Sequence, residues 1–262
     1  FLRTSRYEGG FVPGTWRGTS APDKNVRGIY LATHFYNYYQ SAPVEDVAQY
    51  VQELGLWGIN SVLVWYDMHH FQGFADPEAA ALRARLKRVM QAAHSCGIGV
   101  GLLVLGNEAY GDSPKELRAD RSAKRGGFYD ADICPNKPGG LDYTLKVMGE
   151  YFEWAGDVRP EYVCIWPYDQ GSCGCEQCRP WGANGFLKCA RSISGLAHQK
   201  LPGTKIILST WLYDTNEWQG LKQAFSPKPD WVDLIMTESA AFAREGISGM
   251  PTVGFPEISM EG

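Results

Sequence analysis

The stretch that decides the fold is residues 99–105, which read Gly-Val-Gly-Leu-Leu-Val-Leu and are followed by Asn107 and Glu108. A continuous apolar run of this length is typical of a strand buried on both faces, and such strands belong to parallel sheets covered by helices. The segment before the run has a helical period and begins at Asp76 and Pro77, a good N-cap followed by a good first helical residue. Its apolar residues fall on one helical face: Leu82, Leu86, Val89 and Ala93.

The same unit, an apolar run next to a helical period, repeats along the chain. The predicted strands are 28–35, 61–66, 99–105, 162–166, 205–211, 232–236 and 252–255. Seven such units favour a closed (β/α) barrel over an open doubly wound sheet. The first strand continues into Thr33-His34-Phe35-Tyr36-Asn37 without a glycine, so the phosphate-binding turn of nucleotide folds is missing.

Length and composition suit one large domain. The chain has 262 residues, of which 44% are hydrophobic, enough for a single barrel core. The sequence ends at Gly262, soon after the seventh predicted strand, so we expect an α/β fold of the TIM type, (β/α)8, truncated after strand seven. Residues 1–26 are expected to be a lead-in from a preceding region, and residues 27–262 a catalytic barrel that is incomplete at its C-terminus.

Charge and hydropathy exclude two classes of partner. A net charge of -4 provides no basic footprint for nucleic acid. No apolar run approaches the roughly 20 residues that a membrane span needs. Residues 1–4 lack the basic and apolar regions of a signal peptide, so the compartment stays open, with the periplasm and secretion among the alternatives.

In barrels of this type the active site lies at the C-terminal ends of the strands. Six of the seven predicted strand ends carry a carboxylate: Asp67, Glu108, Asp169, Asp214, Glu238 and Glu257. Four of them have an aromatic neighbour. Aromatic faces match the C–H faces of sugar rings, and carboxylates bind hydroxyls or act as acid, base or nucleophile. Any one of these carboxylates also suits a helix cap, but caps do not require adjacent Trp and Tyr, so the set predicts a carbohydrate site.

Glycoside hydrolysis needs two carboxyl groups that flank the scissile bond. We expect the catalytic pair among Asp169, Glu238 and Glu257. Asp169 follows an aromatic strand end, where partial burial would raise its pKa for an acid role. Substrate contacts are expected from the other strand-end side chains: His34, Trp65, Asp67, Glu108, Trp166, Tyr168, Trp211, Tyr213 and Asp214.

Two alternatives stay open. A barrel that binds carbohydrate without cleaving it would show the same aromatic residues. A metal-dependent hydrolase would use His34, His69 or His70 together with Asp67, although the adjacent pair His69-His70 lacks the i, i+4 spacing of a helical metal site and suits the rim of a pocket.

Five segments carry a resemblance to known proteins. Residues 27–30, 56–62 and 65–67 resemble the opening of bacterial glycosidase barrels, a group that includes α-glucuronidases, β-hexosaminidases and endo-β-N-acetylglucosaminidases acting on N-glycans. Residues 133–138 and 168–178 are similar to the third and fourth strand-end segments of poorly characterised members. The resemblance covers about residues 27–260 and implies a glycosidase barrel whose carboxylates need no cofactor.

The sequence departs from two patterns within that group. The hexosaminidase pattern places adjacent Asp and Glu at the end of strand four, where this chain has Asp169 followed by Gln170. The α-glucuronidase pattern spreads carboxylates over strands four, six and seven, which matches this layout better. It has Glu at the strand-four position, however, and this chain has Asp169 there.

The sharpest local motif is Cys173-x-Cys175-x-x-Cys178, in the loop after the fourth predicted strand. Cys134 lies in the loop after the third strand, which is its neighbour. The four thiolates suit a closed structural Zn²⁺ site. One or two disulfides, as in an exported protein, and unpaired thiols are the alternatives. The remaining cysteines are expected to be small buried residues: Cys96, Cys164 and Cys189.

Overall fold

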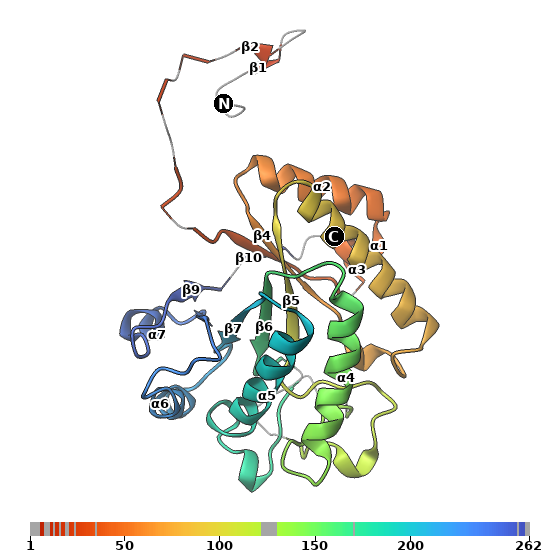
Figure 1. Ribbon diagram of the computed structural model, residues 1–262, viewed down its shortest axis with the longest axis vertical. Helices are drawn as coiled ribbons and strands as arrows, with labels where there is room; N and C mark the ends of the chain where they lie inside the picture. Colours follow the sequence, from red (N-terminus) through yellow and green to blue (C-terminus); the bar gives the residue numbers. More distant parts are fainter. Residues whose placement is uncertain are drawn as a thin grey trace.

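A curled sheet of parallel strands forms the centre of the computed structural model (Figure 1). The structure describes residues 6–7, 11–12, 14–15, 17–18, 21–23, 25–34, 36–121, 130–169, 171–255 and 257–259. In chain order the strands are β3 (Gly28–Leu31), β4 (Ser61–Trp65), β5 (Gly99–Leu105), β6 (Tyr162–Trp166), β7 (Lys205–Ser209), β8 (Leu234–Thr237) and β9 (Thr252–Gly254). Each pairs in parallel with the next. The predicted α/β fold of the TIM type is confirmed.

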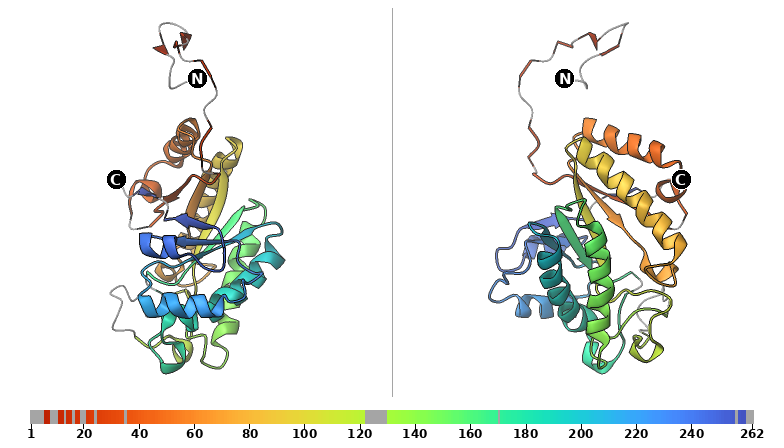
Figure 2. Two further views of the ribbon diagram at one scale, coloured as in Figure 1. Left: turned by 90° about the vertical axis from the view of Figure 1, so that its left-hand side faces the viewer. Right: turned by 45° about the vertical axis from the view of Figure 1, so that its right-hand side comes forward.

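Helices connect the strands and cover the outside of the curl. They are α1 (Tyr38–Ser41), α2 (Val44–Leu56), α3 (Pro77–Ser95), α4 (Gly140–Ala155), α5 (Gly185–Lys200), α6 (Thr215–Ala224) and α7 (Ala240–Glu245). Helices α2 and α3 lie side by side, and so do α4 and α5 (Figure 2). None of the helices among the described residues is long and apolar enough to cross a membrane.

Short elements complete the chain. In the described part of the chain, the connections hold the 3-10 helices η2 (Met68–His70), η3 (Lys115–Leu117), η4 (Glu176–Cys178) and η5 (Trp181–Ala183). Within the segment predicted as a lead-in, β1 (Arg6–Tyr7) and β2 (Phe11–Val12) form an antiparallel pair. The division at residue 26 stays a prediction.

Two hydrophobic layers explain why the strands are apolar throughout. In β4, Val62 and Val64 belong to the layer between the sheet and the helices. Leu63 and Trp65 alternate with them and belong to the inner layer, enclosed by the curl. Both faces of the strand are therefore removed from water, and the alternation of polar and apolar residues seen in half-exposed strands is not expected.

One segment reaches both edges of the sheet. Strand β9 pairs with β8, and β10 (Glu257–Ser259), only a few residues later, pairs in parallel with β3. Ile29 in β3 is the partner of Glu257. Strand β10 thus pairs with the first strand, as the eighth strand does in a complete barrel.

Five of the seven predicted strands have different limits in the structure. The second, fifth and seventh end one or two residues earlier than expected, and the first and sixth differ for reasons that the structure shows. The first was expected to extend to residue 35 but ends at Leu31, because the Thr33 hydroxyl takes over the pairing and donates to the Trp65 carbonyl at 2.7 Å. The sixth was expected at 232–236 but lies at Leu234–Thr237. There the Asp233 carboxylate accepts from the Ile206 N–H at 2.8 Å, so a side chain replaces the strand backbone.

Candidate functional site

The C-terminal ends of β3 to β8, called here the barrel mouth, hold most of the predicted site residues. At the ends of β4 and β5 the structure builds a buried network from Asp67, His69 and Glu108, which are 1%, 7% and 0% exposed. His69 Nε2 lies 2.9 Å from Asp67 Oδ1, and His69 Nδ1 lies 3.2 Å from Glu108 Oε1. His70 Nε2 lies 2.9 Å from the second oxygen of Asp67.

The backbone and a tryptophan fix the Glu108 carboxylate in this network. Glu108 Oε1 accepts from the Met68 N–H at 2.7 Å, and Oε2 accepts from the Trp65 indole N–H at 3.1 Å. Trp65 is 1% exposed. In this structure it therefore supports Glu108 from within the barrel, with almost no surface available to a ligand.

Opposite charges determine the protonation of the network. Burial acts to lower the pKa of His69, but the hydrogen bonds to Asp67 and Glu108 outweigh it and raise the pKa to about 10. Burial acts to raise the pKa of Asp67, and the bonds from His69 and His70 bring it below its usual value. His69 is thus an imidazolium with both nitrogens facing carboxylates, a form that has no lone pair for a metal ion.

The His69 pKa predicts how stability depends on pH. The folded value of about 10 lies above the unfolded value of 6.5, so the contribution of His69 is complete below pH 6.5 and is lost as the pH rises through 10. We expect the free energy of unfolding, measured in urea, to fall between about pH 7 and pH 10. The same series with His69→Gln should lose most of this slope, and an equal slope in the two proteins would contradict the assignment.

A neutral histidine and a tyrosine lie beside the network. Burial lowers the pKa of His34 to about 4, so its imidazole is neutral near pH 7 and is able both to donate and to accept a hydrogen bond. Its Nδ1 lies 3.2 Å from the Tyr30 hydroxyl. Burial raises the pKa of Tyr30 well above 10, and the charges of Asp67, Asp169 and Glu108 add to this shift. His34 thus contacts the Tyr30 hydroxyl directly, and three carboxylates of the predicted site act on it through their charge.

Asp169 follows β6 at the barrel mouth and is half-buried. Next to it in the chain are two aromatic residues, Trp166 and Tyr168, both almost fully buried. The Trp166 ring stacks with Trp211 at a centroid distance of 5.9 Å, and Trp211 stacks with Phe255 at 4.6 Å. Trp211 is half-buried, so this aromatic column reaches from the inner core toward solvent.

A second buried carboxylate, Glu217, organises the ends of β6 and β7. Its Oε1 accepts from the Tyr168 hydroxyl at 2.5 Å and from the Gly182 N–H at 3.0 Å. Asp214 caps α6 and forms a capping box with Glu217. The Tyr213 hydroxyl donates to the Gly182 carbonyl at 2.6 Å. Tyr168 and Tyr213 thus connect the two strand ends, and neither is a freely exposed ring.

A pocket of 590 Å³ opens over this connection. Its wall includes Tyr168, Trp181 and Asp214, together with two cations, Arg121 and Arg179. The Trp181 indole N–H donates to the Pro167 carbonyl at 2.5 Å, which holds one side of the pocket against the end of β6. The pocket adjoins Asp169 in the chain and contains groups that bind hydroxyls or carboxylates.

The other two predicted catalytic residues lie apart from this centre in the chain. Glu238 follows β8, is exposed, and accepts from the Leu212 N–H at 2.7 Å. Glu257 lies in β10 opposite Ile29, and not in a loop after strand seven. The side chain of Glu257 lies outside the described part of the structure, so its role stays a prediction.

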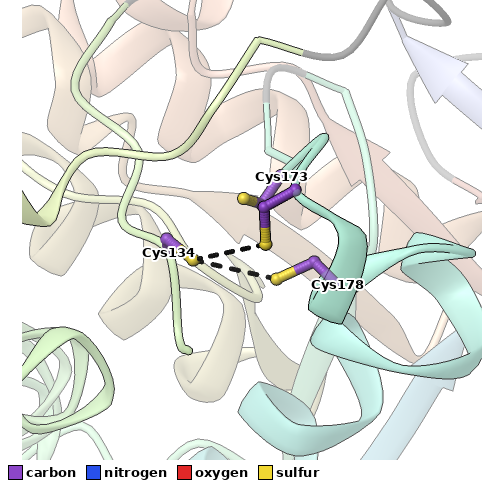
Figure 3. A group of neighbouring side chains, drawn as sticks. Cys134, Cys173 and Cys178 are labelled. Atoms are coloured by element: carbon purple, nitrogen blue, oxygen red, sulfur yellow. Dashed lines mark hydrogen bonds between the residues drawn. The ribbon is translucent and has the colours of Figure 1, made fainter. Parts of the chain in front are cut away.

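The four cysteines of the predicted metal motif converge (Figure 3). The sulfur atoms of Cys134, Cys173, Cys175 and Cys178 all lie within 4.8 Å of one another. Cys134 Sγ is 3.8 Å from the sulfurs of both Cys175 and Cys178. All four are free thiols in this structure, at distances well beyond the roughly 2.05 Å of a disulfide bond. The predicted convergence is confirmed, and the donor set suits a metal ion.

Gly140 allows Cys134 to reach the cluster. A Cβ atom added at Gly140 would lie 2.1 Å from the Cys134 carbonyl oxygen, a backbone atom that cannot rotate away. We expect Gly140→Ala to lower the free energy of unfolding by about 1–3 kcal/mol through overpacking. Gly195→Ala, in the exposed middle of α5 with nothing within 4 Å, should raise it by about 0.5–1 kcal/mol. Urea unfolding of both variants measures these changes. Equal changes in the free energy of unfolding would contradict the role of Gly140.

Sequence reasoning missed three buried groups. His69 was expected at the rim but is buried, and only its neighbour His70 has a side chain 36% exposed. Glu217 was not expected in the site because it lies within a helix. Asp132 is 1% exposed, and among the described residues neither carboxylate oxygen has a hydrogen-bond partner. Burial raises its pKa well above the usual value of an aspartate, which favours the protonated form.

No protein-family model and no curated protein matches the sequence. Solved structures do match its fold. An exo-β-N-acetylglucosaminidase from Vibrio harveyi is similar over 90% of this chain and 42% of its own, with 15% identity and a TM-score of 0.54. An α-amylase from Lactobacillus plantarum is similar over 83% and 54%, with 13% identity and a TM-score of 0.53. An exo-β-1,4-mannosidase from an Opitutaceae bacterium is similar over 81% and 37%, with 11% identity and a TM-score of 0.52.

These matches concern the fold. The chain has a barrel architecture that glycoside hydrolases also have, so the resemblance to glycosidase barrels is confirmed at that level. The chain spans only about a third to a half of the length of these structures. At such low identity a fold does not carry a reaction with it, and function has to be argued from the site.

Proposed function

We propose that this protein is a glycoside hydrolase that cleaves a glycosidic bond in an oligo- or polysaccharide with carboxylate chemistry. The observation that carries the proposal is the position of Asp169. It follows β6 at the barrel mouth, directly after Tyr168 in the chain, and Tyr168 lines a pocket with hydrogen-bonding walls. A carboxylic acid at this position would give its proton to the leaving-group oxygen as the glycosidic bond breaks.

Asp169 acts as the general acid in this proposal, and Glu238 or Glu257 supplies the second carboxylate. In an inverting enzyme the two carboxyl groups are about 6.5–9.5 Å apart, and the second one activates a water molecule. In a retaining enzyme they are about 5–5.5 Å apart, and the second one attacks the sugar. Glu238 is exposed at the end of β8 and is held by the Leu212 N–H, which suits a group that orients water. Glu257 is the alternative partner.

Substrate binding is assigned to two parts of the mouth. Trp211 offers a half-buried ring for the apolar face of a sugar. The pocket lined by Asp214, Arg121 and Arg179 offers donors and acceptors for hydroxyls of a neighbouring unit. His34 and Asp67 remain candidates for hydroxyl binding deeper in the mouth, whereas Trp65, Trp166 and Glu108 support these groups from within the core.

The reaction as proposed needs no cofactor. The rival, a metal-dependent hydrolase built on Asp67, His69 and His70, would require a neutral His69 with a free nitrogen lone pair. Both nitrogens of His69 face carboxylates, which favours the charged form. The four-cysteine cluster, if it binds a metal, leaves no open coordination position, so we assign it a structural role.

The test is a screen of the purified protein against a panel of oligosaccharides and polysaccharides, with products identified by mass. We expect release of a sugar or of a shortened glycan. The rate should stay the same when a chelator that does not reach the buried thiols is added. A folded preparation that binds glycans but cleaves none would favour the non-catalytic barrel. Cleavage that requires an added metal ion, and that Asp67→Asn alone abolishes, would favour the metal-dependent hydrolase.

A further inference from the structure

We propose that Cys134, Cys173, Cys175 and Cys178 bind one Zn²⁺ ion that cross-links the loops after β5 and β6 and so holds the wall of the substrate pocket. The proposal concerns a structural metal site and is independent of which reaction the mouth performs. Cys134 comes from the connection between β5 and α4, and the other three from the connection between β6 and α5. These two connections are neighbours at the barrel mouth because their strands pair.

The distances between the sulfur atoms fit a tetrahedron around zinc. With a Zn–S bond of about 2.3 Å, the edge of a regular ZnS₄ tetrahedron is about 3.8 Å. Cys134 Sγ lies 3.8 Å from Cys175 Sγ and 3.8 Å from Cys178 Sγ, and all four sulfurs fall within 4.8 Å. Bonded sulfurs would be at about half that distance. The side chains point toward one centre, as Figure 3 shows for the cysteines that it labels.

Hydrogen-bond donors surround the sulfurs, as thiolates require. Four thiolates around Zn²⁺ carry a net charge of −2, which N–H donors stabilise. The Asn136 side-chain amide donates to Cys178 Sγ at 3.2 Å. The Lys137 N–H donates to the Cys134 carbonyl oxygen at 3.3 Å, which holds the backbone of the loop that carries this ligand. On binding, each thiol releases its proton to the solvent and gives an electron pair to the metal, so no oxidant or reductant is needed.

The choice of zinc follows from the donors. A closed tetrahedral set of four thiolates selects Zn²⁺ or an iron centre, and excludes Mg²⁺ and Ca²⁺, which prefer oxygen ligands. Cys173, Cys178 and Cys134 are buried, and Cys175 is half-buried. The fully ligated ion would therefore have neither an open position nor access for a substrate.

The position of the cluster gives the metal its role. Cys173 and Gly174 line the 590 Å³ pocket, and Cys173 comes only four residues after Asp169. The Cys178 side chain packs against Gly185, at the first residue of α5. A metal ion bound to Cys173 and Cys178 would hold both ends of the segment between them, which follows Asp169 in the chain. The pocket wall would then keep one conformation.

Two measurements on the unaltered chain test the site. Elemental analysis of protein prepared without chelator should give about one zinc ion per chain. Replacement of zinc by Co²⁺ should give the intense sulfur-to-cobalt absorption and the visible bands of a tetrahedral thiolate site. No bound metal, with all seven thiols open to alkylation after denaturation, would overturn the proposal. So would a disulfide among these cysteines, detected by its mass before reduction.

Point variants distinguish the loss of zinc binding at this site from a general loss of folding. Cys173→Ser should weaken zinc binding at least tenfold, since a change in an outer-shell group alone costs about 10–100-fold. Asn136→Ala keeps all four ligands and should weaken binding about tenfold. Cys96 was expected to be buried but is exposed at the end of α3, outside the cluster. Cys96→Ser is therefore the matched control and should leave zinc content unchanged. Equal zinc affinity in Asn136→Ala, Cys173→Ser and the control would contradict the assignment.

Discussion

Asp169→Asn should lower kcat for glycan hydrolysis by about 10²–10⁴-fold with little change in stability. Asn has nearly the shape of Asp but no proton to give, so the variant keeps the contacts of the half-buried side chain while losing the acid. The measurement is steady-state hydrolysis of the best substrate from the glycan screen, together with urea unfolding of both proteins.

The leaving group distinguishes an acid from a binding residue. A sugar attached to a good leaving group, such as a dinitrophenol, needs no protonation, so the variant should lose much less activity on it than on the glycan. Asp157→Asn is the matched control, because Asp157 is 65% exposed and pairs with Lys87 on the surface. A control as inactive as Asp169→Asn, or an equal loss on both substrates, would contradict the acid role.

His69→Gln should lower the free energy of unfolding by about 3–5 kcal/mol, the usual cost of removing one partner from a buried ion pair. The substitution removes the positive charge between Asp67 and Glu108 and leaves two buried carboxylates near each other. Glutamine is neutral, so its amide donates hydrogen bonds without compensating the charge of either carboxylate. Urea unfolding near pH 7, where His69 is charged, measures the loss.

His94→Gln is the control for that experiment. His94 also pairs with a carboxylate, Glu161, at 3.1 Å, but the two side chains are 30% and 47% exposed. Exposed pairs contribute about 0–1 kcal/mol, so this variant should change stability by less than about 1 kcal/mol. If the two histidine variants were equally stable, the network at the barrel mouth would have no special role in holding the fold.

The sequence predicted those strands best that are buried on both faces. The runs 99–105 and 162–166 match β5 and β6 at both ends, because hydrophobicity alone sets their limits. The first strand was predicted too long, since the Thr33 side chain replaces a backbone pairing and ends the strand at Leu31. A side-chain hydrogen bond of this kind leaves no trace in a pattern of apolar residues.

The same contrast holds for the site. The convergence of Cys134 with the three later cysteines was predictable, because parallel neighbours bring their C-terminal loops together. The burial of His69 was not, since it depends on Glu108, which lies 39 positions further along the chain. Only the three-dimensional register of β4 and β5 shows that the two residues meet.

The pairing of one segment with both edges of the sheet has a consequence for how the chain folds. Ile29 and Glu257 are partners although more than two hundred residues separate them in the chain. The entropic cost of closing such a loop has to be met before the contact stabilises anything, and topologies with distant contacts fold slowly. The inner strands, whose partners are close in sequence, would form first, and the pairing of β3 with β10 would form last. Until then β3 would keep an unpaired edge, open to association with another chain.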